Sequence, residues 1–196
     1  MESKAHTDLW NLFIDGDDKA YSQLYLHFAD VLFAFGSRYS FDKELVKDSI
    51  HDVFVDLYRY RKNLSINVNV KSYLLTSLKR KIAYLLKKQA GSDYNENAFL
   101  ITFSVEDKII DNERQREILL KVKKELDQLP DRQKEALYLR YNTELEYEEI
   151  AGIMDISVAT CRTMVYRALK QLRERMENVG GYHMLLFLLR TCCPKN

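Results

Sequence analysis

Residues 147–173 constrain the fold of this chain most, because their pattern predicts two short helices joined by a tight turn. Apolar side chains recur at helical spacing up to Met154, and Asp155 and Ile156 then interrupt the pattern. Ser157 follows, and its hydroxyl can cap a second helix by accepting a backbone N–H hydrogen bond. The stretch therefore predicts a helix-turn-helix.

The second predicted helix has two different faces. One is apolar and consists of Val158, Cys161, Val165, Leu169 and Leu172. The other carries Arg162, Thr163, Tyr166, Arg167 and Lys170, and residues 156–173 hold four basic residues and no acidic one. Such a helix fits the major groove of DNA, where Arg162 can contact a base for about 1–3 kcal/mol of discrimination while Arg167 and Lys170 hold phosphates. The alternative is a helical hairpin with a merely solvated charged face, and we favour DNA reading.

Composition sets the class of the whole chain. With 196 residues, 46% of them hydrophobic, the chain can form one or two small domains with real cores, and only two prolines and six glycines favour an all-α fold. The start of the chain does not resemble a signal peptide, so we expect a cytoplasmic protein. The three cysteines and four histidines lack metal-ligand spacing, and no phosphate loop or catalytic motif occurs, so we expect no metal and no cofactor.

The net charge of +1 hides an asymmetry between neighbouring segments. Residues 1–57 hold eleven acidic and five basic residues, whereas residues 58–92 hold nine basic residues and no acidic one. Separate acidic and basic surfaces favour two different partners, one of them a polyanion.

The acidic segment contains a row of carboxylates on one predicted helix, which begins near residue 42. The row consists of Glu44, Asp48, Asp52 and Asp56, at intervals of four residues. Three interpretations remain open at this point: a solvated face, a docking surface for a basic partner, or the metal site of a phosphodiester enzyme built on Glu44, Asp48 and Asp52. The third is remote, because a two-metal site needs ligands that converge from several elements.

The basic segment combines cations with tyrosines. A polar connection at residues 63–69 leads into a predicted helix with Tyr73 and Tyr84 among its lysines and arginines. Single-stranded DNA binds to such surfaces, because phosphates attract cations and unstacked bases stack on aromatic rings for about 1–3 kcal/mol each. Each tyrosine by itself is equally well explained as a core residue.

Four stretches together resemble one family. They are DGDDKAYSQLY, DKELVKDSIHDVFVDLYRYR, VKSYLLTSLKRKIAYLLKK and LPDRQKEALYLRYNTELEYEEIAGIMDISVATCRTMVYRALKQLRERM. In this order they resemble bacterial RNA polymerase sigma factors of the sigma-70 family, of the extracytoplasmic-function (ECF) type, in the style of Bacteroidetes members. The resemblance implies two small helical domains joined by a flexible linker. The expected parts are a region 2-like domain at 1–89, a linker at 90–103, a region 4-like helix-turn-helix domain at 104–177 and an apolar tail at 178–196.

The resemblance also implies roles for particular residues. Positions that match the family's docking site for core RNA polymerase, on the clamp helices of its largest subunit, are Asp48, His51, Asp52, Phe54 and Tyr58. Positions that match its minus-ten strand-capture site are Asn67, Asn69, Lys71, Tyr73, Lys79, Arg80 and Lys87. Positions that match its minus-thirty-five site are Tyr147, Arg162, Thr163, Tyr166, Arg167 and Lys170.

The chain departs from the family pattern at several of these places. His51-Asp52 stands where Gln-Glu is common, Lys79-Arg80 replaces a frequent Arg-Asn pair, and Tyr84 replaces a usual aspartate. Asp155 stands where glycine is common in the turn, and aspartate tolerates the left-handed backbone better than most residues.

The resemblance implies a transcription initiation factor rather than an enzyme. Its expected partners are core RNA polymerase, including the flap of the second-largest subunit, promoter DNA and an anti-sigma factor. The alternative is a stand-alone helix-turn-helix regulator that binds duplex DNA without polymerase. The apolar run at residues 182–189 is far shorter than the roughly 20 residues of a membrane span, so we expect a short helix that packs on its own domain and no direct membrane insertion.

Overall fold

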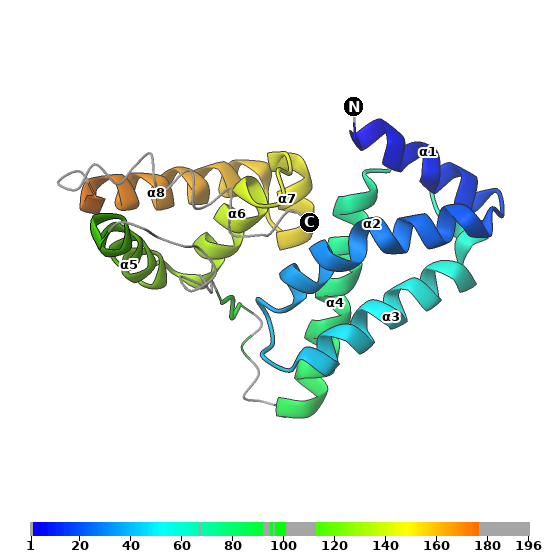
Figure 1. The fold of residues 1–196 in the computed structure, drawn as a ribbon, viewed down its shortest axis with the longest axis horizontal. Coiled ribbons are helices and arrows are strands. Elements are labelled where there is room, and N and C mark those ends of the chain that lie inside the picture. Colours follow the sequence, from blue (N-terminus) through cyan, green and yellow to red (C-terminus); the bar gives the residue numbers. More distant parts are fainter. Residues whose placement is uncertain (1, 67, 92–94, 96, 101–112, 177–196) are drawn as a thin grey trace. The chain divides into compact units, whose positions relative to one another are not determined.

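The computed structural model describes residues 2–66, 68–91, 95, 97–100 and 113–176, and within these residues every regular element is helical. The chain forms two compact units, Met1–Glu96 and Asn97–Asn196. The predicted all-α class with a helix-turn-helix in the second unit is confirmed (Figure 1). The predicted tail at 178–196 and half of the predicted linker at 90–103 lie outside the described residues.

The described residues of the first unit form four α-helices and one short 3-10 helix. They are α1 (Glu2–Ile14), α2 (Asp18–Gly36), α3 (Lys43–Arg59), η1 (Arg61–Asn63) and α4 (Val70–Ala90). Helices α2 and α3 lie side by side, and α4 packs across both of them (Figure 1). Large side chains that are almost completely buried form the core between them, and they include Trp10, Phe13, Phe28, Phe35, Phe54, Leu74 and Leu78.

Helix starts in the first unit are capped by side chains. The Oδ1 atom of Asp17 accepts hydrogen bonds from two backbone N–H groups of α2, at 2.7 and 3.2 Å. Asp42 does the same for α3, at 3.0 and 3.1 Å, and Asn69 caps α4 at 3.0 Å. Each cap satisfies donors that the first turn of a helix leaves unpaired, which fixes where α3 and α4 begin.

Gly36 ends α2 without a left-handed backbone conformation. It is the last residue of α2, it is buried, and it is followed by Ser37 in a right-handed helical conformation. A Cβ atom at this position would lie 2.7 Å from Cγ1 of Val46 in α3 and 3.1 Å from Cδ1 of Ile82 in α4. The glycine is therefore explained by close helix packing rather than by a left-handed cap.

The second unit contains the helix-turn-helix. Its helices are α5 (Glu113–Asp127), α6 (Asp131–Tyr141), α7 (Tyr147–Met154) and α8 (Val158–Met176). Pro130, which the sequence places near the first turn of a helix, is the N-cap residue of α6. The sequence also predicts a capping box of Ser104 and Asp107, which lies outside the described residues. A capping box at α7 pairs Glu146 with Glu149.

Candidate nucleic-acid interface

The turn between α7 and α8 has the geometry that the sequence predicted. Asp155 adopts the left-handed conformation, with φ 52° and ψ 54°, and Ser157 Oγ accepts a hydrogen bond from the Thr160 N–H at 3.1 Å. Arg132 of α6 supports the turn, because its guanidinium donates to the carbonyl of Met154 at 3.0 Å. The turn holds α8 at a defined angle against α7.

Helix α8 presents its polar face to solvent. Cys161, Val165, Ala168 and Leu172 are buried against the unit, and burial raises the pKa of the Cys161 thiol, which therefore stays protonated in the core. All five predicted residues of the other face are exposed: Arg162, Thr163, Tyr166, Arg167 and Lys170. Tyr166 is 66% exposed, so most of its ring surface is accessible to a partner. Within the described residues of this unit, the face is open to solvent.

Arg162 is held by two residues of α7. Its Nη2 atom lies 3.1 Å from Oε1 of Glu148, and its guanidinium lies over the ring of Tyr147, 5.4 Å from the centroid. Arg140 of α6 also lies over that ring, at 4.8 Å, and donates to the carbonyl of Leu145 at 2.7 Å. Sequence reasoning selected Tyr147 and Arg162 but missed Glu148 and Arg140. The only available signal was a pair of glutamates directly after Tyr147.

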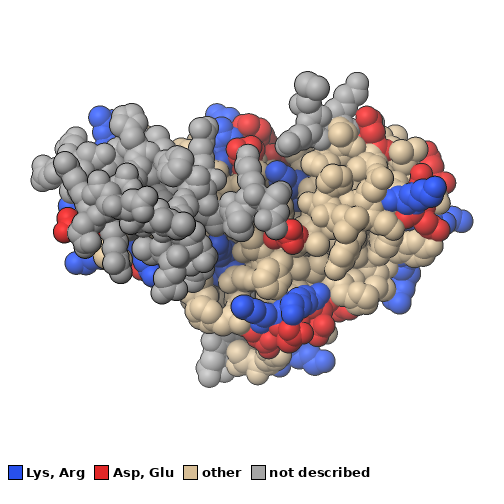
Figure 2. Space-filling model, viewed as in Figure 1, with Lys and Arg blue, Asp and Glu red and all other residues tan. Residues whose placement is uncertain are grey.

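The carboxylate row on α3 is only partly free. Asp48 and His51 are exposed, but Asp52 makes a 2.8 Å ion pair with Lys81 of α4. Glu44 pairs with Lys47 at 2.7 Å, and Asp56 lies 4.0 Å from Arg59. Acidic and basic side chains accordingly lie next to one another over the first unit (Figure 2).

The other two predicted docking residues of α3, Phe54 and Tyr58, differ in how far they are exposed. Phe54 is buried in the core and is not a surface residue. Tyr58 is 44% exposed, and its hydroxyl donates to Oδ1 of Asp18 at 3.2 Å, while Arg61 lies over its ring. A partner that binds α3 would thus contact Asp48, His51 and Tyr58 directly, with Phe54 holding the helix in place from beneath.

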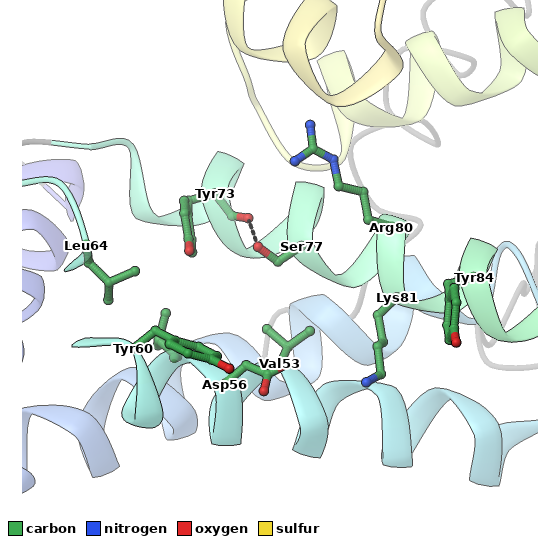
Figure 3. A pocket seen from close by; sticks show the side chains of 10 residues that line it. Val53, Asp56, Tyr60, Leu64, Tyr73, Ser77, Arg80, Lys81 and Tyr84 are labelled. Carbon is green, nitrogen blue, oxygen red and sulfur yellow. Dashed lines mark hydrogen bonds between the residues drawn. The ribbon is translucent and has the colours of Figure 1, made fainter. Parts of the chain in front are cut away.

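A pocket of about 340 Å³ lies between α3, the segment after η1 and α4 (Figure 3). Its lining residues are Val53, Asp56, Leu57, Tyr60, Leu64, Tyr73, Ser77, Arg80, Lys81 and Tyr84. Three tyrosine rings and two cations therefore surround one cavity. Lys81 points toward α3, where its hydrogen bond to Asp52 raises the pKa of Lys81 above its ordinary value and keeps it charged (Figure 3).

Of the described residues predicted for strand capture, two line this pocket. They are Tyr73 and Arg80. Asn69 caps α4, Lys79 lies 5.8 Å from the centroid of the Tyr39 ring, and Lys87 is exposed in the last turn of the helix. Lys71 is half-buried at the start of the helix, and Asn67 lies outside the described residues.

Trp10 anchors the pocket wall from α1. Its indole N–H donates to the carbonyl of Ser65 at 2.9 Å, and its ring packs edge-to-face on Tyr73, with centroids 5.2 Å apart. Sequence reasoning did not identify this role of Trp10. The hydrogen bond holds the segment before α4, and the ring contact holds Tyr73 of α4.

Two further observations bear on alternatives. In the described part of the chain, no three His, Cys, Asp or Glu side chains lie together as metal ligands. Among the same residues, no helix combines the length and the apolar character that a bilayer span requires.

The exposed basic helix of a helix-turn-helix, together with a second helical unit that carries an aromatic pocket, defines an all-helical DNA-binding protein. Residues 119–172 match the family described as "Sigma-70, region 4". The chain is 27% identical over 175 residues to the ECF RNA polymerase sigma-E factor of Escherichia coli K12, covering 83% of this chain and 87% of that protein. The sigma-E factor of Salmonella typhimurium LT2 matches over the same shares. The chain is thus similar to ECF sigma factors of the sigma-70 family over most of its length, and its second unit carries the sigma-70 region 4 match.

Solved structures share the fold. The sigma factor RpoE from Bartonella quintana, in complex with the anti-sigma factor NepR, superposes with a TM-score of 0.59 at 22% identity, covering 81% of this chain and 98% of that one. CnrH, in complex with the cytosolic domain of CnrY, superposes with a TM-score of 0.58 at 17% identity, covering 89% and 98%.

Proposed function

We propose that this chain is a transcription initiation factor that binds core RNA polymerase and directs it to promoters. The observation that carries the proposal is the exposed basic face of α8, which lies within the segment that matches sigma-70 region 4. In this proposal residues 104–177 read the minus-thirty-five element, residues 1–89 dock on polymerase and capture the minus-ten strand, and residues 90–103 connect them. The protein acts in the cytoplasm, and the Lys-Arg-Lys at residues 79–81 supports kinship with Bacteroidetes members.

Minus-thirty-five reading rests on α8. Arg162 contacts a base edge in the major groove, and Thr163 and Tyr166 lie beside it on the same exposed face. Arg167 and Lys170 hold phosphates, and Tyr147 supports Arg162 from α7. Base contacts supply the specificity, and phosphate contacts set the register of the helix on the duplex.

Polymerase docking rests on α3. The exposed carboxylate of Asp48 and the side chains of His51 and Tyr58 form the contact surface for the basic clamp helices of the largest subunit. Asp52 contributes its negative charge next to this surface while it pairs with Lys81. The flap of the second-largest subunit is the proposed partner of the second unit.

Minus-ten capture rests on the pocket beside α4. A base flipped out of a melted strand enters between the tyrosine rings, and stacking there offsets the few kcal/mol that unstacking costs. Arg80 lines the same pocket, and the exposed Lys87 attracts the backbone further along α4. The pocket lies within the size range of about 300–1,000 Å³ that is usual for small ligands.

An anti-sigma factor is a further proposed partner. Both solved relatives are complexes, one of them with a named anti-sigma factor. Such a partner would cover one of the two DNA-binding surfaces or the docking surface of α3.

The test is co-elution of the purified chain with core RNA polymerase, followed by run-off transcription from DNA upstream of its own gene. We expect a stable complex and new initiation that core polymerase alone does not give. Tight binding to duplex DNA by the chain alone, without binding to polymerase, would instead favour a stand-alone regulator.

A further inference from the structure

The contact between α7 and α8 places a carboxylate beside the arginine that is expected to read a base. Glu148 Oε1 lies 3.1 Å from Nη2 of Arg162, and the two side chains are 63% and 60% exposed. A surface ion pair of this kind contributes little to stability. The pair can instead affect the position of the Arg162 guanidinium and the net charge around it.

The arginine is restrained on two sides rather than on one. Its guanidinium lies over the Tyr147 ring while Nη2 donates to Glu148. The ring itself is restrained, because Arg140 also lies over it and is fixed by the Leu145 carbonyl at 2.7 Å and by Glu146 at 3.0 Å. A chain of contacts from α6 through α7 thus defines the position of Arg162 before DNA binds.

The chemistry of the guanidinium makes this restraint selective. Arginine has five N–H donors in a rigid planar fork, so one donor can remain on Glu148 while others make the paired contact with O6 and N7 of guanine. A phosphate contact does not require a fixed orientation of the guanidinium, because a phosphate attracts the positive charge from any direction and carries no sequence information. A carboxylate next to Arg162 therefore weakens phosphate binding by this residue more than it weakens base reading.

We propose that Glu148 is a specificity-determining residue, which positions Arg162 for a base edge and opposes its use as a general phosphate contact. The inference rests on the proposed function, because it assumes that Arg162 reads the minus-thirty-five element. Glu148 is a positioning residue in this scheme, since it acts through Arg162.

The same unit offers a matched control. Glu174 lies 3.8 Å from Lys170, the side-chain exposures are again 60% and 63%, and the lysine is a proposed phosphate contact. Glu148→Gln and Glu174→Gln each remove one exposed negative charge beside one basic residue of α8. General electrostatics predicts the same result for both variants.

The experiment measures binding of the full chain, in complex with core RNA polymerase, to two duplexes. One is selected by that complex from a library of random sequence, and the other is the same duplex with its upstream element scrambled. We expect Glu148→Gln to lower the ratio of the two affinities by about tenfold, mostly by tighter binding to scrambled DNA. Glu174→Gln should tighten binding to both duplexes equally and leave the ratio unchanged.

The Arg162→Ala variant distinguishes a wrong role for Glu148 from a wrong role for Arg162. In Arg162→Ala, Glu148→Gln should no longer change the ratio, because its effect passes through the arginine. If Arg162→Ala itself leaves the ratio unchanged, base reading by Arg162 is wrong and the inference falls with it. If Arg162→Ala lowers the ratio but Glu148→Gln behaves like Glu174→Gln, the inference alone is overturned.

Discussion

The pocket of the first unit and the α8 face of the second unit both combine tyrosines with basic side chains, but they present them in different ways. In the pocket, Tyr60, Tyr73 and Tyr84 surround a cavity between two helices. On α8, Tyr166 and the basic residues project outward from one helix. A concave aromatic site suits an unstacked base, whereas a convex helix suits the groove of a duplex. The difference shows that residue composition alone does not separate strand capture from duplex reading.

Charge pairing differs between the two units as well. In the first unit, Lys81 pairs with a carboxylate of the proposed docking face, so one ion pair joins the pocket to α3. In the second unit, Arg162 pairs with Glu148 inside the helix-turn-helix itself. The following predictions test whether the two units have separate tasks.

The largest effect is expected from charge reversal on α3. Asp48→Lys combined with Asp52→Lys should weaken co-elution with core polymerase by about 100-fold or more, because basic clamp residues would meet like charges. Duplex binding by the second unit should not change. Since Asp52→Lys also breaks the pair with Lys81, a variant that adds Lys81→Asp restores that pair with reversed charges. If this variant binds polymerase again, the double substitution had acted by breaking the Asp52–Lys81 pair and not by changing the docking surface.

The next effect is expected on α8. Arg162→Ala should weaken binding of the polymerase complex to its selected duplex by about 10- to 100-fold and to scrambled DNA only slightly. Lys170→Ala is the comparison, because loss of a phosphate contact should weaken both duplexes to a similar extent. If Arg162→Ala weakens binding to the selected and the scrambled duplex equally, as Lys170→Ala does, base reading by α8 is contradicted.

A smaller effect is expected in the pocket. Tyr84 is 65% exposed, so Tyr84→Ala should leave the unit folded and remove one stacking surface. We expect about fivefold or greater weakening of binding to a single-stranded minus-ten oligonucleotide by the polymerase complex, measured by fluorescence anisotropy. Phe41→Ala removes a ring that is 77% exposed in the same unit but outside the pocket, and it should have no effect. An equal loss in both variants would place the strand elsewhere.

The smallest effect concerns the turn of the helix-turn-helix. Asp155 has φ 52°, a conformation that costs non-glycine residues roughly 1–2 kcal/mol, partly offset by the greater unfolded-state entropy of glycine. Asp155→Gly should therefore raise the free energy of unfolding of the second unit by less than about 1 kcal/mol in urea. Asp155→Val, with a branched Cβ at the same φ, should lower it, and stabilisation by valine would contradict this explanation.

The sequence predicted well those features that depend on neighbours along the chain. The cap at Ser157, the left-handed Asp155 and the two faces of α8 are all local, because helix periodicity and capping act within a few residues. The exposure of Arg162 and Arg167 followed from the same periodicity.

Contacts between elements could not be predicted in this way. The pairs Asp52–Lys81 and Arg162–Glu148 depend on how two helices cross, which no local pattern specifies. The same holds for the pocket, whose wall depends on Trp10 reaching the Ser65 carbonyl from α1. Gly36 does end α2, but its close approach to Val46 of α3 could not be predicted, because it depends on how two helices pack.

That missing side chain at Gly36 has a mechanical consequence. Because a Cβ atom there would meet Val46 of α3 and Ile82 of α4, α2, α3 and α4 approach one another at Gly36 too closely for any larger residue unless these side chains shift. This close packing places α3 and α4 next to each other. The Asp52–Lys81 ion pair then links the proposed docking face of α3 to the pocket that Lys81 lines.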